Sequence, residues 1–137
     1  DTHQDNFGRL SKLLPPFDRG LAAMLDRLNE RGLLHKTAIM AAGEFGRTPK
    51  VLTQQPPGRQ HWPRCFSSIL AGAGIAGGQL YGKSDKHANQ PIMNPVRVEE
   101  LAATIYHALD IPLNGPETNS GLARPLTTGK PIMELFG

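Results

Sequence analysis

An uncharged run at residues 37–43 (TAIMAAG) constrains the fold of this chain more than any other feature. It contains no charged side chain, and β-branched residues stand at its front. A run of this kind is typical of a strand buried on both faces, as strands are in a parallel sheet covered by helices. We therefore expect a mostly parallel sheet in this protein.

Two helices accompany this strand in the predicted order of elements. Apolar residues recur at steps of three and four over residues 8–31 and again over residues 98–109. Pro15 and Pro16 interrupt the first of these patterns. Proline removes a backbone donor and disfavours a helical residue before it, so we expect a kink there or a helix that restarts at the prolines.

Two further apolar segments are predicted to be strands, at residues 66–72 and 79–82. A long loop at residues 44–63, rich in polar, glycine and proline residues, precedes them. The order of helix, strand, loop, strands and helix predicts an α/β domain, with a mostly parallel sheet flanked by helices. In such sheets ligands bind beyond the carboxyl ends of the strands, so we expect the polar motifs of the loop at one rim.

The composition excludes several classes of protein. The 137 residues suit one domain, and a net charge of +3 without a lysine or arginine run argues against nucleic-acid binding. No stretch reaches the roughly 18–20 apolar residues that a membrane span needs. Cys65 is the only cysteine, so no internal disulfide can form. The chain starts at Asp1 and not at a methionine, so we expect further residues before it.

Two segments carry candidate metal ligands. In an extended chain Asp1 and His3 point to the same side and could give a carboxylate and an imidazole to one zinc-like ion. His61 stands beside Trp62 and Pro63, which could hold its ring in a fixed position. Each segment has a structural alternative: the first pair could be a solvated loop end, and His61 could stack on an aromatic surface.

A third segment, residues 44–48, follows the uncharged strand directly. Glu44 is placed there as a ligand or as a structural anchor, and Gly46 would let the backbone turn closely around an anion. Arg47 carries a planar guanidinium that fits phosphate or sulfate. The structural alternative is an ion pair between Arg47 and Glu44 that closes a turn.

Taken together, these motifs resemble a known superfamily. Asp1-Thr2-His3, residues 43–49 (GEFGRTP) and His61-Trp62-Pro63 resemble the C-terminal part of the alkaline phosphatase superfamily, near the cofactor-independent phosphoglycerate mutases and the sulfatases. The segment from Gly121 to Leu126 also resembles a Gly-x-x-Leu segment near the end of these proteins. The likeness is closest to a bacterial sulfatase-like family labelled as a domain of unknown function, number fifteen-oh-one, and it covers the whole chain.

The resemblance implies a metal site. Asp1, His3 and His61 match the positions that hold one divalent metal ion, zinc before manganese or calcium. Where the superfamily has a second-metal Asp-His pair, this chain has Glu44 followed by Phe45, and only the first of these could be a ligand. The spacing of Asp1 and His3 is also shorter than the usual Asp-x-x-x-His.

The resemblance also implies an activity and a location. Residues 1–137 would be the C-terminal part of an alkaline-phosphatase-like domain, and the nucleophile would lie in an N-terminal half outside this chain. The whole protein would hydrolyse an anionic phosphate or sulfate ester, with Arg47 holding the anion, and the chain alone would be inactive. A periplasmic or extracellular location is implied, and an incomplete sheet would favour self-association of the chain.

Two other hypotheses remain open. A non-catalytic binding or structural member of the same fold is favoured by Phe45, which occupies a position where the superfamily has a ligand. A simple α/β interaction module with a basic surface is the third, but it leaves the grouping of acidic, histidine and arginine residues unexplained.

Overall fold

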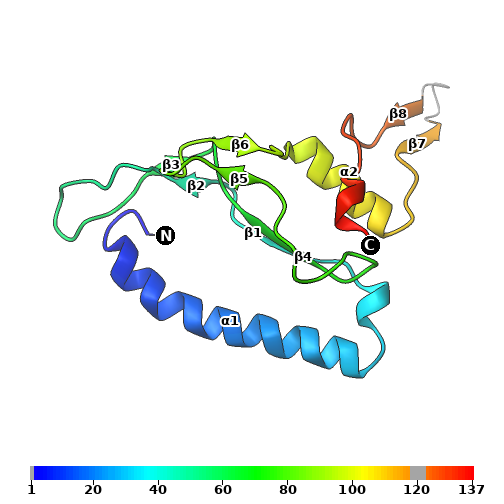
Figure 1. Ribbon diagram of the computed structural model, residues 1–137, viewed down its shortest axis with the longest axis horizontal. Helices are drawn as coiled ribbons and strands as arrows, with labels where there is room; N and C mark the ends of the chain where they lie inside the picture. Colours follow the sequence, from blue (N-terminus) through cyan, green and yellow to red (C-terminus); the bar gives the residue numbers. More distant parts are fainter. Residues whose placement is uncertain (1, 118–122) are drawn as a thin grey trace.

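The computed structural model describes residues 2–117 and 123–137. Two helices and four small strand pairs make up this part of the chain (Figure 1). In chain order the elements are α1 (Asn6–Glu30), the 3₁₀ turn η1 (Leu34–Lys36), β1 (Ile39–Ala42), β2 (Gly46–Arg47), β3 (His61–Trp62), β4 (Ser68–Ala71), β5 (Lys83–Ser84), β6 (Pro91–Met93), α2 (Val98–Ala108), β7 (Asn114–Glu117), β8 (Ala123–Pro125) and the 3₁₀ turn η2 (Met133–Leu135).

The sheet architecture differs from the sequence-based prediction. In the described residues the strands pair only in twos, as β1–β4, β2–β3, β5–β6 and β7–β8, and every pair is antiparallel. The prediction of a mostly parallel sheet flanked by helices, as in an alkaline-phosphatase-like sandwich, is therefore wrong for this structure. Burial was misjudged as well, since Ile39 is buried whereas Met40 is 48% exposed.

The connection between β1 and β4 explains the direction of their pairing. Parallel neighbours need a crossover connection, which is usually a helix. Residues 43–67 join these two strands, and they contain the β2–β3 pair and no helix. The chain therefore folds back on itself, and Ile39 pairs with Ala71 while Ala42 pairs with Ser68.

Several local predictions are confirmed. The helix expected over residues 98–109 is α2, and strands form within 37–43 and 66–72 as β1 and β4. The strand expected at residues 79–82 is wrong, because the chain there is irregular and pairs only from Lys83 onward.

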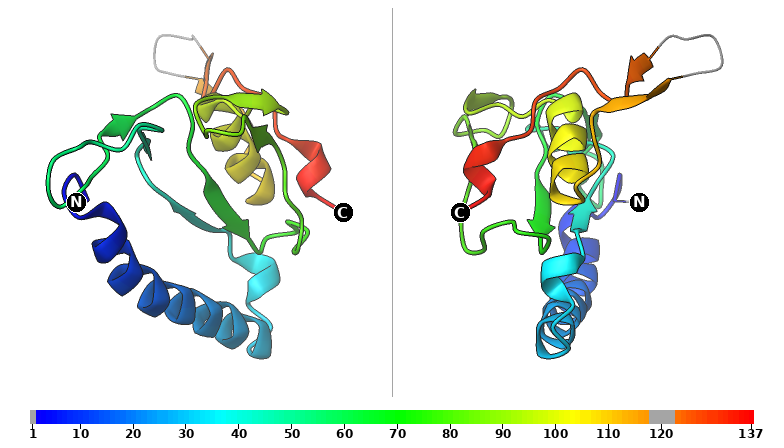
Figure 2. Two further views of the ribbon diagram at one scale, coloured as in Figure 1. Left: turned by 60° about the vertical axis from the view of Figure 1, so that its left-hand side comes forward. Right: turned by 90° about the vertical axis from the view of Figure 1, so that its right-hand side faces the viewer.

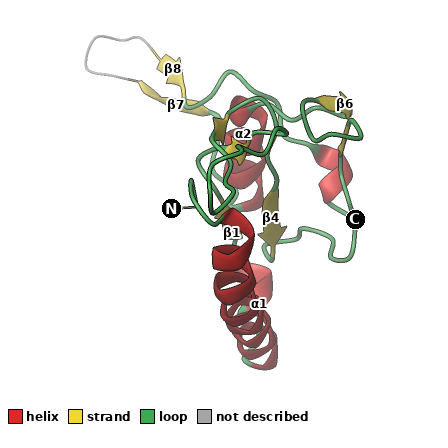
Figure 3. Cartoon of the chain, turned by 90° about the vertical axis from the view of Figure 1, so that its left-hand side faces the viewer, coloured by secondary structure: helices red, strands yellow, loops and turns green. Residues whose placement is uncertain are grey.

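Helix α1 is continuous through Pro15 and Pro16, so the predicted restart at the prolines does not occur. It follows a gentle curve (Figure 2). The rest of the chain holds it near its two ends: the Asn6 amide donates to the Pro57 carbonyl at 3.2 Å, and the turn after the helix leads into η1. Between these ends α1 extends away from the strands (Figure 3), and Asn6 is its only buried residue.

The core is small, and most of its buried residues come from α2 and from the segment that contains η2. Thr104 of α2 is fully buried, and its hydroxyl donates to the Glu100 carbonyl at 2.7 Å and accepts the Ile132 amide at 3.0 Å. The buried apolar residues are Ile39, Ala73, Ala103, Ile132 and Leu135. No helix in the described part of the chain is long and apolar enough to cross a membrane.

Candidate functional site

The hairpin formed by β2 and β3 organises the loop in which the polar motifs lie. Gly46 pairs with Trp62, and Arg47 pairs with His61, so the arginine and the histidine stand opposite each other on neighbouring strands. Beyond this pair the Thr48 amide donates to the Gln60 carbonyl at 2.9 Å. Residues directly opposite in an antiparallel pair have side chains close enough to interact.

His3 joins this hairpin from the start of the chain. Its ring centroid lies 4.5 Å from that of His61, with the two planes inclined at 34°. The Gln54 side chain donates to the His3 carbonyl at 3.2 Å. The same carbonyl lies so close to Gly58 that a side chain at that position would collide with it. The hydrogen bond from Gln54 therefore holds the backbone of His3, and Gly58 leaves room for it because glycine has no side chain.

Arg47 and Phe45 complete the cluster around the two histidines. Arg47 Nη1 lies 3.4 Å from His3 Nδ1 and donates to the Arg59 carbonyl at 3.2 Å. The Phe45 ring lies on His61, with centroids 3.8 Å apart. His61 therefore lies against the rings of Phe45 and His3, and the guanidinium of Arg47 lies beside Nδ1 of His3.

This environment favours the neutral form of His61. Partial desolvation lowers the pKa of His61 below its ordinary value of 6.5. His3 and Arg47 lower that pKa further, while Glu44 acts in the opposite direction. Neutral imidazole is the form that binds a metal ion, so the setting suits a ligand.

The structure brings together three of the five residues predicted for the site: His3 and His61 through their rings, and Arg47 through its contact with His3. For Glu44 the structure gives only an effect of its charge on the pKa of His61. Asp1 lies outside the described residues. Imidazole nitrogens are among the ligands that zinc prefers in proteins. Within residues 2–117 and 123–137, no three side chains of His, Cys, Asp or Glu are grouped closely enough to hold an ion.

Sequence reasoning missed some residues that build the site. It identified neither Gln54 nor Gly58 as supports of His3, and it treated Phe45 only as a departure from a ligand pattern. These contacts link segments that are far apart in sequence, and no periodicity or motif signals them. The glycine and proline content of residues 44–63 was the only hint that the loop takes a fixed shape.

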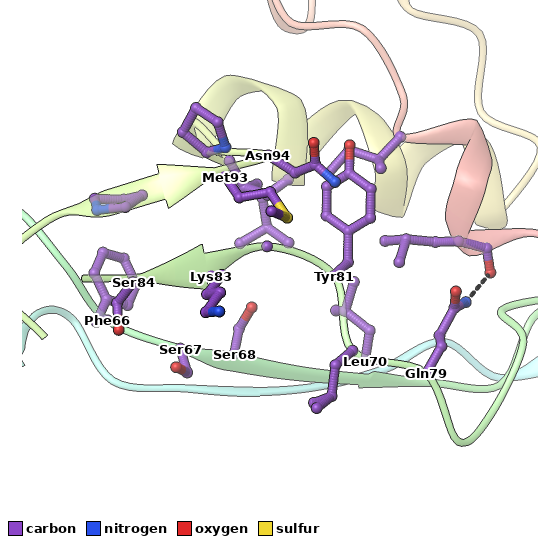
Figure 4. A pocket seen from close by; sticks show the side chains of 18 of the residues that line it. Phe66, Ser67, Ser68, Leu70, Gln79, Tyr81, Lys83, Ser84, Met93 and Asn94 are labelled. Atoms are coloured by element: carbon purple, nitrogen blue, oxygen red, sulfur yellow. Dashed lines mark hydrogen bonds between the residues drawn. The ribbon is translucent and has the colours of Figure 1, made fainter. Parts of the chain in front are cut away.

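A groove of about 440 Å³ lies between β4 and the β5–β6 hairpin. Figure 4 shows Ser68 of β4 and Lys83 of β5 on either side of it. Tyr81 also lines it, and burial, followed by the charges of Glu134 and Glu100, raises the pKa of its hydroxyl. The described lining contains no His, Asp or Glu, and its metal-binding side chain is Cys65, so the histidines proposed as ligands lie outside this groove.

Comparison with known proteins adds one match. Residues 1–136 match the family described as a protein of unknown function, DUF1501. The chain belongs to the DUF1501 family. No curated protein and no solved structure matches this DUF1501 chain. The membership covers all the predicted site residues, but it does not by itself connect them to the alkaline phosphatase superfamily, which stays a prediction.

Proposed function

We propose that this DUF1501 chain supplies metal-binding and anion-binding side chains to a metal-dependent hydrolase of phosphate or sulfate esters. The observation that carries the proposal is the approach of His3 to His61, with ring centroids 4.5 Å apart and Arg47 beside them. Two imidazoles and an arginine from three segments of chain form a compact group suited to an ion and an anionic ligand.

The proposed ligands are His3 and His61, with Asp1 and Glu44 as the carboxylates. Zinc accepts imidazole nitrogens and carboxylate oxygens, and it comes before manganese and calcium for this donor set. A bound ion would polarise the ester and stabilise negative charge on its oxygen atoms. The lowered pKa of His61 keeps its ring neutral and able to donate its lone pair at neutral pH.

Arg47 is the proposed anion-binding residue. Its planar guanidinium can give two parallel hydrogen bonds to a phosphate or sulfate group. β-pairing with His61 holds its backbone opposite a proposed ligand, and its bond to the Arg59 carbonyl directs the side chain toward His3. An anion held there would lie next to the ion and to the charge that develops during ester cleavage.

The reaction needs a nucleophile, which we place in polypeptide outside residues 1–137. Residues 1–137 would then be the C-terminal part of a larger domain related to the alkaline phosphatase superfamily, with a periplasmic or extracellular location. On this proposal the 137-residue chain alone does not turn over esters.

A non-catalytic role for the same cluster is the second candidate. The observation that favours it is the contact of Phe45 with His61, at a centroid distance of 3.8 Å. An aromatic ring that covers a histidine can stabilise a loop without any bound ion. In that case the cluster of His3, Arg47 and His61 would serve the structure or the binding of a partner.

Metal analysis of the complete natural polypeptide tests the proposal. Elemental analysis of the purified protein should find stoichiometric zinc or manganese, which the His61→Ala variant loses and the His87→Ala variant keeps. Hydrolysis of phosphate and sulfate monoesters and diesters should follow the same pattern. If the purified protein contains no metal and hydrolyses none of these esters, the proposal is wrong and the non-catalytic role is favoured.

A further inference from the structure

The accessible surface of this chain is larger than that of a compact folded monomer of the same mass. A folded monomer of 14.9 kDa has an accessible surface of about 7,000 Å². This chain exposes 9943 Å², an excess of about 2,900 Å² over that value. The excess is larger than the area that one partner loses in a standard protein interface, about 800 Å². The excess is large enough for a further polypeptide to cover part of this surface.

The apolar side of α1 is part of this exposed surface. Leu13, Leu14, Phe17 and Met24 are 43–56% exposed, and they belong to the stripe at steps of three and four that normally faces a core. Polar positions such as Arg19 lie on the opposite side. Within residues 2–117 and 123–137, the chain holds α1 near its ends, and residues 11–20 in its middle are all exposed.

Strand β1 has an open edge in the same part of the molecule. Among the described residues it pairs with β4 on one side only, and antiparallel pairing uses the backbone groups of alternate residues. The other residues of Ile39–Ala42 direct their amides and carbonyls away from β4. Met40 is 48% exposed on one face of this small sheet and Ile69 of β4 is 44% exposed on the other, so each face carries an exposed apolar side chain.

We infer that a β-strand from the part of the polypeptide outside residues 1–137 pairs with the open edge of β1 and lies beneath the apolar stripe of α1. Only an extended segment can satisfy the backbone groups of a strand edge, and only uncharged side chains suit the stripe. The inference rests on the proposal that residues 1–137 belong to a larger domain.

The position of this edge indicates what the added strand does. Glu44 is two residues beyond Ala42, the last residue of β1, and Arg47 follows it in β2. A strand paired with β1 therefore brings one of its ends next to the site residues. This placement lets the nucleophile-bearing part of the domain reach the histidine cluster through backbone pairing.

Amide hydrogen exchange of the complete natural polypeptide tests the inference. We expect all four amides of Ile39–Ala42 to exchange about 100-fold or more slowly than unprotected amides, because both edges of β1 are paired. If two alternate amides exchange freely, the edge is open and the inference is overturned. The mass in solution completes the test: protection that is present only in a dimer would assign the edge to a second copy and would also overturn it.

Two α1 variants of the complete polypeptide add a readout that does not depend on exchange. Phe17→Glu puts a charge in the covered stripe and should lower the Tm by about 4 °C or more, whereas Arg19→Glu on the opposite side should leave it nearly unchanged. Equal effects of the two substitutions would contradict a buried stripe. Neither measurement uses metal content or turnover, so a failure here is separate from a failure of the proposed hydrolase.

Discussion

His3 and His61 lie with their ring centroids 4.5 Å apart, although they come from opposite ends of the segment that contains α1, β1 and the β2–β3 hairpin. The backbone of His61 is fixed by pairing with Arg47, and that of His3 by the loop at Gln54 and Gly58. Different contacts therefore hold the two histidines, and together they place the two imidazole rings side by side.

Removing either histidine should weaken the binding of the same ion. In the complete polypeptide we expect His3→Ala and His61→Ala each to weaken zinc binding by about 100-fold or more, because each takes a ligand from one site. The double variant should be little worse than either single one. Titration with zinc and a competing chelator measures the affinities. His87→Ala is the matched control, and a loss that is confined to one of the two histidines would contradict a shared ion.

Gly58→Ala should disturb the position of His3. A methyl group at this residue collides with the backbone of His3, so the loop or the histidine must move. Overpacking of this kind costs about 1–3 kcal/mol of unfolding free energy, measured by urea denaturation. Gly77→Ala is the control, because nothing lies within 4 Å of the added methyl group. Equal stability of the two variants would show that the contact at Gly58 relaxes freely.

Thr104→Val should be more damaging than Thr104→Ser. The buried hydroxyl of Thr104 accepts the amide of Ile132 at 3.0 Å and so ties the segment before η2 to α2. Valine keeps the shape but leaves that amide unpaired, which costs about 1–3 kcal/mol, whereas serine keeps the acceptor. Chemical denaturation of both variants measures the difference. A valine variant as stable as the serine variant would mean that the Ile132 amide finds another partner.

Asp85 should make stability depend on acid pH. The amides of Asn89 and His87 donate to Asp85 Oδ1 at 2.8 and 3.0 Å, and these bonds, that of Asn89 foremost, lower the pKa of Asp85 below its ordinary value of 3.8. The folded state then prefers the ionised form. The resulting stabilisation is present above pH 3.8 and is lost as the pH falls through the lower folded value.

The Asp85→Ala variant tests this dependence. Its loss of stability relative to the parent protein should be largest near neutral pH and should shrink below pH 3.8, as followed by thermal unfolding over a pH series. Asp85→Asn keeps an acceptor oxygen without the charge and serves as the control. A difference between the alanine variant and the parent that stays constant down to pH 2 would exclude a role for ionisation.

Most local elements could be predicted from the sequence. The spacing of apolar residues identified α1 and α2, and the uncharged runs identified β1 and β4. These patterns report local geometry, because side chains repeat every 3.6 residues in a helix and every two in a strand. The motifs around His3, Arg47 and His61 were also found in the sequence, since each is a short stretch of chemically distinctive residues.

Tertiary structure decided the rest. Whether β1 and β4 run parallel or antiparallel depends on the path of residues 43–67, and a list of residue types does not encode that path. The meeting of His3 with His61, and the support of His3 by Gly58, depend on contacts between segments that are distant along the chain. Sequence periodicity thus determined which segments are helices and strands, whereas long-range packing determined how they pair and which side chains meet.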